Sequence, residues 1–104
     1  IDKLIVANIA RYHRKKTPSE KHAHYAHLND EDKKKVKVLA SLLRIADGLD
    51  RTHFSVVEDI ECLLCKDKVI IKVKSKKPSQ DEREAALGKS DLFSIVFNRQ
   101  IEIK

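Results

Sequence analysis

Apolar residues recur along the first half of the chain at the spacing of an α-helix. Between residues 1 and 16, Ile5 and Ile9 fall on one face when successive residues are placed about 100° apart. Further on, Asn29 is followed by three acidic residues. That pattern is typical of a helix N-terminus, where side-chain oxygens cap backbone amides and negative charge is stabilised. We therefore expect helices over residues 1–16 and from about 30 to 50.

A shorter helix is predicted between these two. Thr17 can act as its N-cap, Pro18 suits the first helical position, and Glu20 would complete a capping box. In the longer helix, apolar residues cover nearly half of the circumference. A helix with so wide an apolar face is buried on more than one side.

The period of the pattern changes after residue 55. Apolar and polar residues alternate over 56–64 and again over 68–74, which predicts a hairpin with one buried face. Ser79 and Glu82 form a second potential capping box, so one helix is predicted from there to about residue 97. A short strand over 101–103 completes the chain.

These elements predict an α+β fold with two parts. Residues 1–54 would form a helical domain segment, and residues 55–104 a small β-β-α-β module with an antiparallel sheet. A right-handed crossover would place the last strand beside the first one, which would then be central.

Charge narrows the choice of partners. The chain of 104 residues has 22 Lys and Arg against 16 Asp and Glu, a net charge of +6, which favours a polyanionic partner. Surface lysines that only aid solubility, such as Lys33–Lys35, remain the alternative. The small number of aromatic residues argues against a stacking platform for single-stranded nucleic acid.

The cysteines indicate the cellular compartment. Two cysteines in a chain without a membrane span or signal pattern indicate the reducing cytoplasm.

Two acids stand in the apolar helix. Asp47 and Asp50 recur at i and i+3 beside its buried face, with Arg44 and Arg51 in reach of Asp47 and with His13 of the first helix as a possible partner. Burying a carboxylate is costly unless it is paired or binds a cation. We expect both acids to be structural and paired, in preference to a metal or phosphate site.

The segments IARYHRK (9–15) and IADGLDRTH (45–53) resemble two helices of HD-superfamily phosphohydrolases. In those enzymes the first Asp of the second segment is the last metal ligand, and a His-Asp dipeptide is also required. No His in this chain is followed by Asp. We therefore expect neither a metal site nor a catalytic residue here.

A wider resemblance covers nearly the whole chain. The segments ANIARYHRK (7–15), LASLLRIADGLDRTH (39–53) and KSDLFSIVFNRQIEI (89–103), in this order, resemble the C-terminal region of long-form Ppx/GppA exopolyphosphatases and guanosine-pentaphosphate phosphohydrolases. The resemblance implies an HD-like helical domain followed by a small α/β module. It also implies two N-terminal actin-like domains that carry the catalytic machinery of the parent enzyme, for which Mg²⁺ is expected.

On this reading the chain is a non-catalytic C-terminal fragment that contributes to polyphosphate binding and to dimer or interdomain contacts. A homo-oligomer is expected, because truncation would expose apolar faces that include Ile5 and Ile9. The alternatives are a fragment of a metal-dependent HD phosphohydrolase and a basic nucleic-acid-binding module. A preference of the parent for polyphosphate or for pppGpp stays open. The expected polyanion-binding residues are Arg11, His13, Arg14, Lys15, Arg44 and Arg51.

Overall fold

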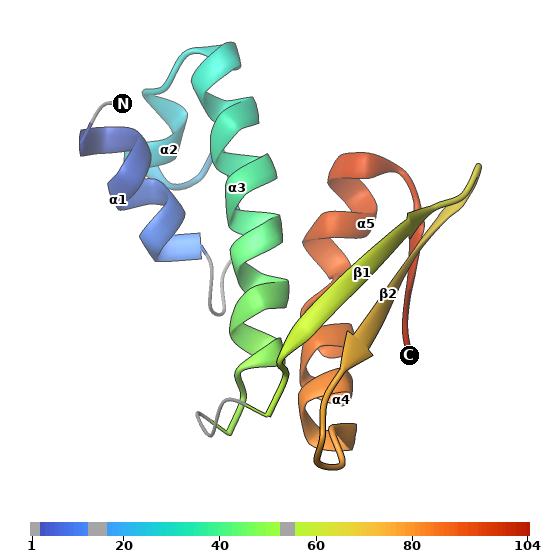
Figure 1. The fold of residues 1–104 in the computed structure, drawn as a ribbon. Coiled ribbons are helices and arrows are strands. Elements are labelled where there is room, and N and C mark those ends of the chain that lie inside the picture. The colour runs from blue at the N-terminus through green and yellow to red at the C-terminus, as the bar shows by residue number, and fades with distance from the viewer. Residues whose placement is uncertain (1–2, 13–16, 53–55) are drawn as a thin grey trace.

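The computed structural model describes residues 3–12, 17–52 and 56–104. Within them the fold is α+β, as predicted, with a helical first half followed by a sheet and two further helices (Figure 1). The elements in chain order are α1 (Lys3–Tyr12), α2 (Ala23–Ala26), α3 (Asp30–Leu49), β1 (Asp59–Leu64), β2 (Lys68–Lys74), α4 (Gln80–Gly88), α5 (Asp91–Phe97) and β3 (Gln100–Ile103). No helix in these ranges is both long and apolar enough to cross a membrane.

The central element is the long helix α3, which has α1 and α2 on one side and α4 and α5 on the other (Figure 1). Asn29 caps its N-terminus, because its side-chain oxygen accepts a hydrogen bond of 2.8 Å from the Asp32 amide. The predicted helix from about 30 to 50 is therefore confirmed.

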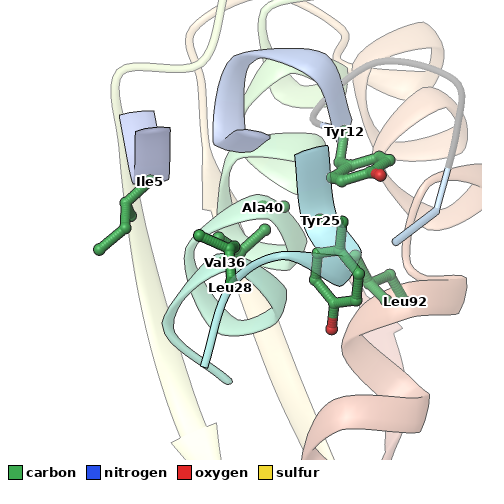
Figure 2. Packing of buried hydrophobic residues seen from close by; sticks show 7 residues of the cluster. All are labelled: Ile5, Tyr12, Tyr25, Leu28, Val36, Ala40 and Leu92. Atoms are coloured by element: carbon green, nitrogen blue, oxygen red, sulfur yellow. The ribbon is translucent and has the colours of Figure 1, made fainter. Parts of the chain in front are cut away.

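The first hydrophobic cluster joins α1, α2, α3 and α5 (Figure 2). Its buried members are Ile5, Tyr12, Tyr25, Leu28, Val36, Ala40 and Leu92. Tyr12 and Tyr25 meet edge to face, with their ring centroids 5.9 Å apart. The expectation that Ile5 is exposed is wrong, because α2 and α3 together cover this face of α1.

The short helix α2 begins later than predicted. Thr17 and Pro18 precede it, and the residue at its N-cap is His22, so the capping box is wrong. The carboxylate of Glu20 instead accepts a hydrogen bond of 2.6 Å from Lys33 Nζ on α3. The Glu20 carboxylate, which was expected to cap the helix locally, therefore forms a tertiary ion pair with Lys33.

The second cluster lies where α3 meets the sheet and the last two helices. It contains Ile45, Val69, Ile71, Ala86 and Phe93. Since α3 contributes to both clusters and Leu92 of α5 lies in the first one, the two halves share their packing. The predicted boundary between residues 54 and 55 stays a prediction.

The sheet differs from its prediction in order and direction. Its order is β1-β2-β3, with β1 antiparallel and β3 parallel to β2, so the sheet is mixed and β2 is central. The predicted antiparallel sheet with a central β1 is therefore wrong. All six residues of β1 are exposed, whereas β2 buries Val69 and Ile71. Asp59 and Glu61 place negative charge on this edge strand, opposite Lys74 and Lys72 of β2.

The helix predicted from residue 79 to 97 is two helices. The chain turns at Lys89 and Ser90, whose amides donate to the carbonyls of Ala86 and Leu87 at 3.1 Å. Ser79 makes no side-chain cap bond, so this capping box is wrong too. The buried carboxylate of Glu82 accepts a hydrogen bond of 2.6 Å from Thr52 Oγ1 and thereby ties α4 to the end of α3.

Candidate functional site

Arg44 is built into the core of the helical half. Its side chain is buried, with 5% of the residue exposed. One guanidinium nitrogen donates to the carbonyl oxygen of Tyr12 at 3.4 Å, and another donates to Asp91 Oδ1 at 2.9 Å. A single cation therefore connects the end of α1, the C-terminal half of α3 and the start of α5. This burial favours a structural role for Arg44.

Arg11 has the opposite environment. It is exposed in the last turn of α1, and its guanidinium carbon lies 5.9 Å from the centre of the Tyr12 ring. With Ala7, Asn8 and His24 it lines a hollow of about 330 Å³. Three other expected binding residues, His13, Arg14 and Lys15, lie outside the described residues.

The two acids of α3 are separated by the fold. Asp47 is half-buried and forms an ion pair with Lys89, a partner that helical spacing along α3 does not predict. Asp50 is the C-cap residue of α3 and is exposed, as is Arg51. The expectation that Asp50 lies beside a buried face is therefore wrong, because Leu39 and Leu43, which flank it when residues are placed about 100° apart, are exposed as well.

A glycine sets the distance between α3 and α4 near these acids. A Cβ atom on Gly48 would lie 2.5 Å from the Cα atom and 2.6 Å from the backbone nitrogen of Ala86. The backbones can approach so closely only because Gly48 has no side chain. This close crossing brings Lys89, one residue beyond α4, within reach of Asp47.

A basic hollow lies between the start of α3 and the outer face of α5. Its volume is about 560 Å³. Its rim carries Lys33, Lys34, Lys37 and Asp30, and its apolar wall includes Leu92, Ile95 and Val96. From the sequence, Lys33 and Lys34 were expected only to be solvated. The sequence does not reveal this hollow, because it depends on a contact between α3 and α5, which are far apart in the chain.

The three lysines of this basic hollow are not equivalent. Lys33 donates a hydrogen bond to Glu20, which raises the pKa of its ammonium group, and its Nζ atom lies 5.7 Å from the centre of the Tyr25 ring. Lys34 and Lys37 are exposed on α3. The arrangement can present two solvent-facing cations to an anion, with Lys33 held at the side.

No group of three or more His, Cys, Asp or Glu side chains in residues 3–12, 17–52 and 56–104 could hold a metal ion. The described residues instead offer ion pairs that are at most partly buried, such as Arg44 with Asp91, and cations at the surface, such as Lys34. Such an arrangement can bind and position an anion.

Comparison with known proteins agrees with the resemblance drawn from the three sequence segments. The family model described as Ppx/GppA phosphatase, domain III, matches residues 1–94. A comparison with curated proteins gave no match. The name of the matched domain implies that proteins of the family carry further domains. Because the match covers most of the chain, the chain belongs to the Ppx/GppA phosphatase family, within which residues 1–94 correspond to domain III.

Proposed function

We propose that this chain is a non-catalytic accessory module of a cytoplasmic Ppx/GppA phosphohydrolase, and that it binds polyphosphate or a similar polyanion. The observation that carries the proposal is the basic hollow, where Lys34 and Lys37 face solvent beside the paired Lys33. The net charge of +6 supports it, because a positive field attracts chains of phosphates. Family membership makes a phosphoanhydride the natural ligand class.

The chemistry would then belong to other domains of the parent enzyme. We place Mg²⁺ and the reacting phosphate there, in the actin-like domains that the family resemblance implies. Positioned cations act on a polyanion without any covalent step, since they hold it in register by charge and hydrogen bonding. The role of this chain would be to guide and retain the substrate, and to support contacts with other domains or with a second subunit.

Arg11 is a second candidate contact, in the hollow lined by α1 and α2, which shares no lining residue with the basic hollow. Arg14 and Lys15, close to Arg11 in the sequence, would add further positive charge, and Arg51 would add charge just after α3. Arg44 is bonded to Asp91 and Tyr12, so we expect it to contribute through the fold and not through contact with the ligand.

The experiment compares charge removal at the basic hollow with equal removal elsewhere. The variant Lys34→Ala/Lys37→Ala loses two cations at the hollow, and Lys72→Ala/Lys74→Ala loses two from β2. We expect the first variant to bind polyphosphate more weakly and with a smaller salt dependence than the second, because fewer counterions are released. Equal effects in both variants would mean that only net charge matters.

A parallel arm tests the first helix. We expect Arg11→Ala/Arg14→Ala to lower polyphosphate affinity with little change in stability, since Arg11 is exposed. Unchanged affinity would remove these residues from the site. Competition between polyphosphate and RNA at one salt concentration separates the proposal from a nucleic-acid-binding module, which unspecific phosphate contacts alone would not do.

A further inference from the structure

Strand β1 forms one edge of the sheet, and β2 is its only neighbour in the strand order of the described residues. All its residues are exposed, including Ile60 at 41% and Leu64 at 82%. An exposed edge strand offers unpaired backbone groups, which makes it a template for pairing with another strand. Its apolar side chains make that pairing more favourable.

The hairpin shows which backbone groups face outward. Cys65 donates its amide to the carbonyl of Lys68 at 2.9 Å, and the antiparallel register continues from there. Since hydrogen bonding alternates along such a ladder, Leu63 faces β2, whereas Cys62 and Leu64 direct their amides and carbonyls away from it. The amide of Ile60 also points away, because it donates to the carboxylate of Asp59.

The same three outward-facing residues line an apolar groove. Ile60, Cys62 and Leu64 form one wall of a groove of about 440 Å³, and α3 forms the opposite wall with Leu42, Ala46 and Leu49. The backbone edge and the apolar side chains are thus available to the same partner. A strand that added to β1 would extend the sheet and cover part of this groove.

We propose that the partner is a second copy of this chain, with the two β1 strands paired antiparallel about a two-fold axis at Cys62. Ile60 of each copy then lies opposite Leu64 of the other, so all three outward-facing residues are paired. Glu61 lies opposite Leu63 of the second copy. The inference rests on the subunit contacts in the proposed function and names the surface that makes them.

Charge selects this register over its neighbours. A shift of two residues one way would place the two Glu61 side chains directly opposite each other, which is unfavourable. A shift the other way would place Ile60 opposite Lys66. In every register Asp59 still faces Lys74 and Glu61 still faces Lys72 within its own copy, so the lysines of β2 partly offset the negative charge at the interface.

Asp59 limits how tightly the strands pair. Its carboxylate accepts the Ile60 amide at 2.9 Å, and that amide must be released when the second strand binds. The Asp59 side chain therefore lowers the affinity of the proposed dimer. We expect Asp59→Ala to strengthen association, which a dimer through any other surface would not show.

Oxidation with diamide, which takes one hydrogen from each of two thiols to form a disulfide, tests the axis. A hydrogen-bonded antiparallel pair places its Cα atoms about 5.5 Å apart, within the span of a disulfide. We expect Cys65→Ser to form a covalent dimer as fast as the unchanged chain, and Cys62→Ser to lose it. Equal crosslinking by the two variants would overturn the proposed register.

A charge exchange at Cys62 provides a second test that does not depend on oxidation. Two lysines or two aspartates on the axis repel each other, so Cys62→Lys and Cys62→Asp should each weaken self-association by roughly fivefold or more in sedimentation velocity. An equimolar mixture of Cys62→Lys and Cys62→Asp should associate again, because opposite charges then meet on the axis. That recovery would also show that both variants fold. The same exchange at Cys65 is the control and should have no such pattern.

The outcomes separate this inference from the function on which it rests. If the chain dimerises but the charge exchange at Cys62 has no effect, the surface is wrong and the subunit contact stands. If the unchanged chain sediments as a monomer at every concentration, both the proposed surface and the subunit contact are wrong. Polyphosphate affinity, measured independently, bears on neither result.

Discussion

Arg44 of α3 donates a hydrogen bond of 2.9 Å to Asp91 of α5, although 47 residues separate them in the sequence. The pair is asymmetric, because the Arg44 side chain is buried while the Asp91 side chain is half exposed. The guanidinium has therefore left water more completely than the carboxylate. Losing the acid should cost more than losing both charges together.

We expect Asp91→Ala to lower the free energy of unfolding by about 1–3 kcal/mol, because it removes a partner from a buried cation. Arg44→Met should cost less, since it keeps much of the buried stem and removes the charge. In the Arg44→Met background, Asp91→Ala should have little further effect. Urea denaturation of the four chains measures this cycle, and additive losses would show that the two side chains act independently.

The two glycines provide a matched pair. Gly48→Ala should destabilise the fold by about 1–3 kcal/mol, because the new methyl group would overlap the backbone of α4. A Cβ atom on Gly88 would have no neighbour within 4 Å, so Gly88→Ala should be neutral or stabilise by up to about 1 kcal/mol through helix propensity. Thermal unfolding of both variants tests this, and a stable Gly48→Ala chain would contradict the close helix crossing.

The two buried tyrosines should respond differently to loss of the hydroxyl group. Tyr12 Oη lies 2.6 Å from His22 Nδ1, whereas Tyr25 Oη has no hydrogen-bond partner among the described residues and points away from its cluster (Figure 2). Tyr12→Phe should therefore cost about 1 kcal/mol, and Tyr25→Phe should be neutral or stabilising. Equal losses in denaturant titrations would mean that Tyr25 Oη is satisfied in solution.

Stability should fall on the alkaline side. Burial raises the pKa of Tyr12 and of Tyr25 above the ordinary value of 10.0, and a hydrogen bond to Glu102 raises the pKa of Lys68 above 10.5. Each group then holds its proton more tightly in the folded chain than in the unfolded one. Their contribution is complete below the unfolded pKa values and is lost as pH rises through the folded ones.

The measurement is the free energy of unfolding on either side of pH 10. The double variant Tyr12→Phe/Tyr25→Phe is the control, because its stability should fall less steeply over the same interval. If the unchanged chain and the double variant fall equally, the tyrosines do not cause the loss.

The isolated chain should not release phosphate from polyphosphate or pppGpp with Mg²⁺. Phosphoryl transfer needs a metal-bound, positioned phosphate and an oriented nucleophile. The described residues offer no group of three metal-binding side chains. Phosphate release by the purified chain, abolished by Asp47→Ala, would favour the HD phosphohydrolase alternative instead.

Hydrophobic periodicity was sufficient for the elements that bury a regular face. It predicted α3, the hairpin and the last strand. The buried face expected for the hairpin is found on β2 alone, because all six residues of β1 are exposed. Local capping signals failed at Glu20 and Glu82, since tertiary partners bind these carboxylates. The prediction of the strand order was wrong because the sequence does not show which strand is buried at the centre of the sheet.

The candidate site was less accessible to sequence reasoning. Pairing rules for residues three or four apart suggested Arg44 and Arg51 as partners of Asp47, but Lys89 reaches it from 42 residues away. One signal was present, since Gly88 followed by Ser90 and Asp91 is typical of one helix ending and another beginning. Recognising that break would have placed Asp91 at a helix start, near the surface of α3.

The position of α3 in both hydrophobic clusters has a consequence for how the chain opens. If α3 unfolds, both clusters lose residues with which their other members pack. Unfolding of one half of the chain alone is therefore unfavourable. Amide protons in the middle of α3 should exchange with deuterium at the slow rate set by global opening, while those of the exposed strand β1 exchange through smaller local fluctuations. A protease that cuts between the two halves would then release no independently folded piece, and the cut chain would hold together until it unfolds as a single unit.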